Sequence, residues 1–156
     1  MTWMPLLATL LGAVIALSSA VLVERRRERR EDRVERRKTK REVYGRYLAA
    51  HADTRTQLRV LSLAAGLTDE ERGNRAFSAY AACYAARYEL AVLAPQTVLT
   101  PANDFDRCAR DLRDLVMDGR NMHAAVGEPP RMQSYLDAMK LVHLAMRIDL
   151  GADDRG

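Results

Sequence analysis

Histidine and cysteine are the side chains of this sequence best suited to acid–base or nucleophilic chemistry. Three histidines (His51, His123 and His143) and two cysteines (Cys83 and Cys108) are spread along the chain, with no Asp or Glu at a ligand-like offset from a histidine. A Cys108–His143 pair across two helices is geometrically possible as a nucleophile and its base, but nothing in the sequence places the two side chains together. Because His51 and His143 fall on apolar helix faces, hydrogen-bonded core histidines are the favoured interpretation.

The sequence contains none of the motifs GxGxxG, GxxxxGK[ST], HExxH, GxSxG or CxxC. Several aspartates share one arc of a predicted helix together with Arg107: Asp104, Asp111, Asp114 and Asp118. Carboxylates on one face can bind a divalent cation, but no second segment offers ligands at matching spacing, so a solvated face is favoured. We therefore expect no catalytic residue, no metal site and no bound cofactor.

The elements that would position any such chemistry begin with an apolar stretch. Residues 6–23 are eighteen residues without a charge, and as a helix from Thr2 the segment spans roughly 33 Å, enough for a bilayer core of ~30 Å. We therefore predict a transmembrane helix over residues 3–23. The alternatives are a cleaved signal peptide, for which Ser18-Ser19-Ala20 supplies a cleavage pattern, and a buried helix of a globular core. No basic residue precedes the stretch, which argues against the signal peptide.

Residues 24–42 hold eleven Arg and Lys against six Asp and Glu, a net charge of +5, whereas the rest of the chain has a net charge of −1. The basic pI thus belongs to one juxtamembrane helix and not to a folded face, which argues against nucleic-acid binding. The positive-inside rule predicts a single-pass protein of the cell membrane with its N-terminus outside and a cytoplasmic C-terminal domain. The basic residues within a Debye length of ~8 Å are expected to contact anionic headgroups: Arg25, Arg26, Arg27, Arg29 and Arg30.

Small residues recur at every fourth position of the predicted span: Ala8, Gly12, Ala16 and Ala20. Small side chains allow close helix–helix approach in lipid, so a parallel homodimer through this face is one hypothesis. The alternatives are that the face packs on another protein's span or on nothing. Repulsion between two segments of charge +5 argues against the dimer.

Helical periodicity continues to the end of the chain and predicts an all-α fold. We expect the span to continue into a basic, charge-mixed juxtamembrane helix over residues 24–42, followed by an antiparallel bundle of about four helices over residues 43–150 and a frayed tail over residues 151–156. Gly66 ends the first bundle helix, Thr68 and Glu71 form a capping box for the second, Thr100 caps the third, and Gly127 ends it.

Each predicted helix has an apolar face. The first carries Val43, Tyr44, Tyr47, His51, Thr54, Leu58, Leu61 and Ala65; the third carries Phe105, Cys108, Ala109, Leu112, Leu115, Val116, Met122 and Val126. The second is apolar on nearly all sides, with an aromatic stripe (Phe77, Tyr80, Tyr84 and Tyr88), so we expect it to be the central helix. On the fourth, Leu141, Leu144 and Ile148 lie apart from the main apolar face and are predicted to contact a partner.

Two functions of different classes are consistent with these patterns. The first is a membrane-tethered helical interaction, scaffold or accessory module that recruits or regulates a protein partner at the bilayer. The alternative is a small-molecule or lipid-binding sensor or enzyme with a pocket inside the bundle, lined by Tyr80, Tyr84, Tyr88 and Met139. A cavity above ~300 Å³ with convergent polar groups would favour the alternative.

Overall fold

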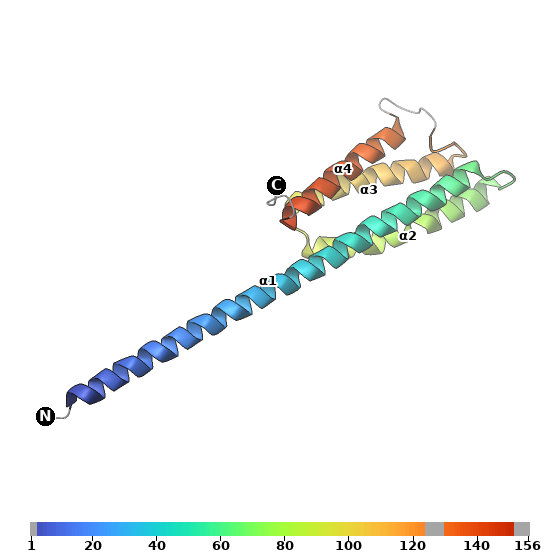
Figure 1. Cartoon of the computed structure of the whole chain (residues 1–156). Coiled ribbons are helices and arrows are strands. Elements are labelled where there is room, and N and C mark those ends of the chain that lie inside the picture. The colour runs from blue at the N-terminus through green and yellow to red at the C-terminus, as the bar shows by residue number, and fades with distance from the viewer. Residues whose placement is uncertain (1–2, 124–129, 152–156) are drawn as a thin grey trace. The chain divides into compact units, whose positions relative to one another are not determined.

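The computed structural model describes the backbone of residues 3–123 and 130–151, and the side chains of these residues from Glu24 onward. The described residues form four helices and no strand: α1 (Trp3–Leu63), α2 (Asp69–Leu93), α3 (Gln96–Met117) and α4 (Arg131–Asp149). The all-α class is therefore confirmed. The chain divides into two units, residues 1–39 and residues 40–156. The second unit is a helical bundle made of the end of α1 and of α2, α3 and α4 (Figure 1).

The corner between α1 and α2 follows the predicted turn signals. Gly66 adopts φ 81°, a left-handed conformation that glycine reaches without a steric penalty. The Thr68 hydroxyl then accepts a hydrogen bond from the Glu71 amide at 3.2 Å, and the Glu71 carboxylate accepts one from the Thr68 amide at 3.0 Å. The capping box is confirmed, and it satisfies two amides that the start of a helix leaves without partners.

The helix α3 begins earlier than predicted. Its cap is Pro95, and its first residue is Gln96 where the sequence favoured Thr100 as the cap. Pro101 consequently lies inside the helix, where it cannot donate to the carbonyl four residues back. The additional turn buries Val98 completely, and the burial of this side chain outweighs the missing hydrogen bond.

The same helix also ends earlier than predicted. Gly119 adopts φ 73°, its amide donates to the carbonyl of Val116 at 3.0 Å, and the Arg120 amide donates to the carbonyl of Leu115 at 3.1 Å. This pair of bonds is a Schellman motif, which ends the helix at Met117. Predicting the end at Gly127 was wrong; Val126 and Gly127 lie outside the described residues.

The core is centred on α3, whereas the sequence had suggested that α2 is the central helix. The helix α3 contacts both α2 and α4, and its buried residues are Val98, Ala102, Phe105, Asp106, Ala109, Leu112, Leu115 and Val116. Of the eight residues predicted for the apolar face of the first bundle helix, the seven that lie in α1 are buried, whereas Ala65 lies beyond the end of α1 and is exposed. Exposed apolar side chains on α2, such as Tyr88 and Val92, show that this helix is packed on one side only.

Among the residues that the structure describes, no helix is long and apolar enough to cross a bilayer. The side chains of residues 3–23, where the sequence predicts a span, lie outside the described residues, although the backbone there is helical. The same holds for the predicted self-association face of Ala8, Gly12, Ala16 and Ala20.

Candidate functional site

A buried carboxylate, Asp106 of α3, forms the centre of a polar cluster inside the bundle. Its Oδ1 lies 2.9 Å from the Tyr47 hydroxyl and 2.9 Å from Nε2 of His51, both on α1. Its Oδ2 lies 3.4 Å from Nε of Arg87 on α2. The exposed fractions of Asp106 and His51 are 1% and 2%. The carboxylate therefore joins three helices at a depth from which bulk water is excluded.

The hydrogen bonds of this cluster are incomplete. An ionised carboxylate only accepts hydrogen bonds, so Nε2 of His51 carries the hydrogen that it donates to Asp106. The second ring nitrogen of His51, Nδ1, is buried without a hydrogen-bond partner, and so is Oδ2 of Asp106. The nearby Arg87 supplies an opposite charge to Oδ2 but no hydrogen bond of good geometry. Unpartnered buried polar atoms cost stability, so the cluster is not explained by packing alone.

Two tyrosines complete the cluster as donors. The Tyr47 hydroxyl lies 3.1 Å from the carbonyl of Ala102 as well as near Asp106, and the Tyr80 hydroxyl donates to the carbonyl of Asp106 at 3.2 Å. Burial, and after it the charge of Asp106, raises the pKa of both Tyr47 and Tyr80. Both phenols therefore stay protonated, and they tie α1 and α2 to α3.

A pocket of about 460 Å³ opens beside this cluster, between α1 and α4. His51 and Tyr135 form its buried wall, and the exposed residues at its rim include Arg55 and His143. The other lining residues are Leu48, Ala49, Ala52, Thr56 and Met139. A histidine held by a carboxylate beside a pocket has the arrangement of a general base. Because Nδ1 of His51 is itself buried, the walls fit ligand binding better than proton transfer.

The structure does not bring the cysteines and histidines together as a nucleophile and base. Burial raises the pKa of the Cys83 thiol to about 11, and its neighbour is the Thr54 hydroxyl at 3.2 Å. Burial also raises the pKa of Cys108, and no hydrogen bond joins it to His143 among the described residues. His51 lies in the core as expected, whereas the prediction that His143 lies on an apolar face was wrong, since it is exposed.

Two of the four aspartates on the acidic arc of α3 form local ion pairs. Asp104 pairs with Arg107 at 2.8 Å, and Asp114 pairs with Arg113 at 2.7 Å. No group of three or more possible metal-ligating side chains occurs among the described residues. The Arg113 guanidinium also lies 5.2 Å from the ring centroid of Tyr80, a cation–π contact, so this arginine covers the core from outside.

The aromatic stripe of α2 is divided between core and surface. Tyr80 is buried, Tyr84 is half-buried with its ring 5.1 Å from that of Tyr80, and Phe77 and Tyr88 are 56% and 73% exposed. The buried face of α2 runs instead through small residues: Ala76, Ala79, Cys83 and Ala86. Of the residues predicted to line a pocket inside the bundle (Tyr80, Tyr84, Tyr88 and Met139), Met139 lines the pocket between α1 and α4, whereas the three tyrosines do not.

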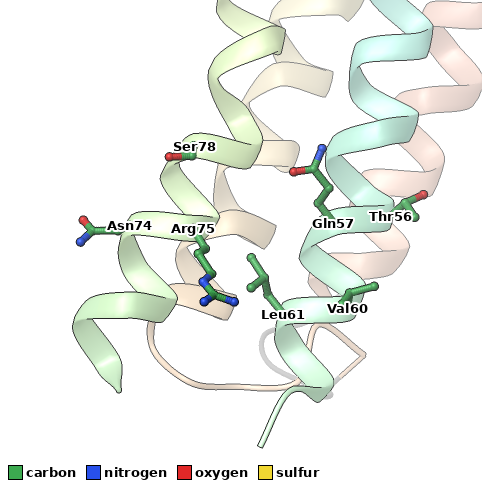
Figure 2. A pocket seen from close by; sticks show the side chains of 7 residues that line it. All are labelled: Thr56, Gln57, Val60, Leu61, Asn74, Arg75 and Ser78. Carbon is green, nitrogen blue, oxygen red and sulfur yellow. The ribbon is translucent and has the colours of Figure 1, made fainter. Parts of the chain in front are cut away.

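A second pocket of about 500 Å³ lies between the end of α1 and the start of α2. Figure 2 shows Leu61 and Arg75 reaching toward each other from the two helices, with Gln57 above them. Val60, at its edge, is 64% exposed. No buried polar atom without a partner belongs to its lining, so this pocket has no chemistry comparable to that beside His51.

The end of α4 is fixed to α1 by a partly buried ion pair. Nζ of Lys40 lies 2.8 Å from Oδ2 of Asp149, and the Tyr44 hydroxyl donates to the same oxygen at 2.6 Å. Burial, together with the hydrogen bond to Asp149, raises the pKa of Tyr44. Beyond this contact, the residues of α4 predicted to contact a partner are exposed: Leu141 by 59%, Leu144 by 49% and Ile148 by 60%.

Sequence reasoning missed Asp106 and Arg87, which form the centre of the cluster. One signal was available: Asp106 lies four residues after Ala102 and three before Ala109, so it shares the helix side of these two small core residues, at the edge of the apolar arc of α3. Comparison with known proteins adds no relative: no family model, curated protein or solved structure matches the chain.

Proposed function

We propose that this chain is a membrane-tethered helical module that recruits or regulates a protein partner at the bilayer. The observation that supports this function best is the exposed apolar surface of α4. Leu141, Leu144 and Ile148 follow the spacing of one helical stripe, and each side chain is about half exposed or more. Large apolar side chains grouped on one face mark a contact surface more often than an ordinary solvated one.

Another face of α4 packs in the core of the bundle. Tyr135, Ala138, Val142 and Met146 are buried against the rest of the bundle, so the exposed stripe is not needed to hold the helix in place. A stripe of this spacing fits an amphipathic helix of a partner, which would cover the three side chains with its own apolar face.

The tether comes from the sequence. The uncharged residues 6–23 have the length that a helix needs to cross a bilayer, and the basic residues that follow favour a cytoplasmic position for the bundle. Arg25, Arg26, Arg27, Arg29 and Arg30 then lie close enough to the surface to bind anionic headgroups. Tethering restricts the bundle to the membrane, where the exposed stripe meets partners held in the same layer.

Leu144→Asp tests the role of the stripe. The full chain is purified in mild detergent from cells, and co-purifying proteins are identified by mass spectrometry. A partner of the stripe should co-purify with the parent chain and be reduced at least about tenfold with Leu144→Asp, because a charge there is desolvated without a partner. The matched control is Val92→Asp, which places the same charge at an 82% exposed apolar position of α2.

Two results would contradict the proposal. One is a set of co-purifying proteins that is the same for both variants and the parent. The other is unfolding of the bundle by Leu144→Asp, seen as loss of circular dichroism, which would show that Leu144 belongs to the core.

A second function is favoured by one observation, the pocket between α1 and α4. Its volume of about 460 Å³ lies within the range of ~300–1,000 Å³ that small-molecule sites occupy. His51 and Arg55 bring polar groups to its walls. A bundle that binds a small molecule could couple that ligand to the partner surface, since Tyr135 and Leu144 lie on the same helix.

A further inference from the structure

Residues 24–39 of α1 carry their charges on two opposite faces. At 100° per residue, the five acids fall within about 100° of arc and seven of the nine bases within about 140° on the other side. The acids are Glu24, Glu28, Glu31, Asp32 and Glu35; the opposed bases are Arg25, Arg26, Arg29, Arg30, Arg33, Arg36 and Arg37. Every charged side chain of this stretch is exposed. The charges of this segment are therefore not mixed at random but are separated by sign onto two faces of the helix.

This order is unfavourable for a helix that stands alone in water. Among charged residues four apart in the stretch, seven pairs have like charges and two have opposite charges. Like pairs at this spacing destabilise a helix by about as much as opposite pairs stabilise it. Within this fully described stretch the one ion pair joins Arg27 and Glu31 at 2.9 Å. An oppositely charged neighbour along each face would relieve the repulsion.

The two faces have the same spacing along the helix. One stripe is Glu24, Glu28, Glu31 and Glu35, and the other is Arg26, Arg30, Arg33 and Arg37. Both follow steps of four, three and four residues, the heptad spacing that keeps a stripe turned toward a parallel neighbouring helix. The stripes are displaced by two residues, or about 3 Å along the axis. Arg26, Arg30 and Arg33, with Arg29, also border one shallow concave part of the helix surface.

We propose that the acidic stripe of one copy of this chain docks on the basic stripe of a second, parallel copy. The inference rests on the proposed tether, because insertion in one membrane would hold the two copies parallel and at the same depth. Each Glu then lies about 3 Å from the level of an Arg on its neighbour, a displacement that the long side chains span. Since each copy keeps one free stripe of each sign, the contact can repeat into a row.

The surplus charge opposes this contact but does not decide it. Residues 24–39 of each copy keep a net charge of +4. This charge is distributed over a length of helix greater than the Debye length of ~8 Å, so much of the repulsion between the two copies is screened. The opposite charges of the stripes meet at contact distance, whereas the surplus bases face solvent ions and anionic headgroups that screen them. Docking is therefore favoured most at low salt.

Charge exchange within the full chain tests the docking. Copies labelled with donor and acceptor fluorophores at the C-terminus are reconstituted in vesicles of phosphatidylcholine with phosphatidylglycerol, and association is measured by energy transfer. Glu28→Arg with Glu31→Arg, or Arg30→Glu with Arg33→Glu, should each weaken association about tenfold, because two opposite-charge pairs of the contact become two like-charge pairs. The four substitutions together restore opposite charges at every level and should restore association.

The second variant, Arg30→Glu with Arg33→Glu, is the control for an effect of net charge alone. Arg30→Glu with Arg33→Glu lowers the charge of the stretch from +4 to zero, so simple repulsion would make this variant associate more strongly than the parent. Shortening the Debye length from ~10 Å to ~3 Å by raising salt from ~0.1 M to ~1 M should weaken the parent and the fourfold variant alike. Association that is equal in all variants, or no recovery in the fourfold variant, would overturn the docking.

A dimer through the small residues of the span gives a different result. Gly12→Ile with Ala16→Ile would abolish that dimer, whereas the charge variants would leave it intact; such an outcome also overturns the docking. Failure of the tether is seen separately, because the parent chain would then not float with the vesicles in a density gradient. If the chain floats with the vesicles but its association is the same in the charge variants as in the parent, the docking alone is contradicted.

Discussion

Asp106 has the position of a structural centre because four side chains from α1 and α2 converge on this one residue of α3. A buried carboxylate costs free energy unless charges and hydrogen bonds compensate for its lost hydration. Here His51, Tyr47 and Arg87 supply that compensation at the carboxylate, although Oδ2 lacks a well-formed hydrogen bond, and Tyr80 donates to the backbone carbonyl of Asp106 instead. Removing the carboxylate leaves donors buried without an acceptor.

Asp106→Ala should therefore lower the free energy of unfolding of residues 40–156 by about 3 kcal/mol or more. Asp106→Asn should cost less, because an amide oxygen still accepts from Tyr47 and His51. The control Asp104→Ala, on the exposed arc of the same helix, should change stability by less than ~0.5 kcal/mol. Urea unfolding measures all three variants; equal effects of the two alanine substitutions would show that the cluster does not hold the bundle.

Cys83 connects stability to pH. Its pKa is raised by burial from 9.0 to about 11, so above pH 9 the unfolded chain loses the thiol proton before the folded chain does. The unfolded state then binds fewer protons, and stability falls as pH rises from 9 to 11. The contribution of Cys83 is roughly 2 kcal/mol by pH 11. Cys83→Ala should remove that part of the pH dependence of unfolding, leaving the part due to the tyrosines; an unchanged slope would contradict it.

Among the elements, the end of α3 depends on one glycine. Gly119 holds φ 73°, and an added Cβ would meet nothing within 4 Å, so its substitution acts through backbone strain alone. Gly119→Ala should cost about 1 kcal/mol. Gly45 is also free of neighbours but lies inside α1, where Gly→Ala should stabilise by about 0.5–1 kcal/mol. Opposite signs of the two changes in urea unfolding are expected; a loss at both positions would contradict the assignment.

The sequence predicted the elements better than it predicted how they meet. Periodicity and the capping box at Thr68 were sufficient for four helices and for the buried face of α1. The end of α3 was misplaced because a Schellman glycine is recognised by its dihedral angle, and two glycines were available. The helix α2 was wrongly predicted to be central because its alanine-rich surface is apolar in sequence whether it is packed or exposed.

The Asp106 cluster could not be predicted for a related reason. Its members come from positions up to 59 residues apart in the chain, and their pairing depends on how three helices rotate about their axes. Periodicity assigns a face to each helix but not the angle at which two faces meet. Asp106 lies at the border of its apolar arc, where burial or exposure is decided by a small rotation.

At the scale of the whole molecule, the chain unites an apolar end, a two-faced charged helix and a bundle with an exposed apolar stripe. Each part has a surface that its own chain does not cover: the stripes of residues 24–39, and Leu141, Leu144 and Ile148 on α4. The proposed tether would make both surfaces effective together, because it would raise their local concentration in the membrane and fix the direction in which they are presented.

The orientation of that tether is open to a direct test. The apolar stretch has no basic residue before it and a net charge of +5 directly after it, so the side carrying the bundle should stay in the cytoplasm. In a background of Cys83→Ala and Cys108→Ala, Thr2→Cys should react with a membrane-impermeant maleimide on intact cells. Gly156→Cys should react only after the membrane is permeabilised. Labelling of Gly156→Cys on intact cells would reverse the orientation, and it would move both the headgroup contacts and the partner surface to the outer side.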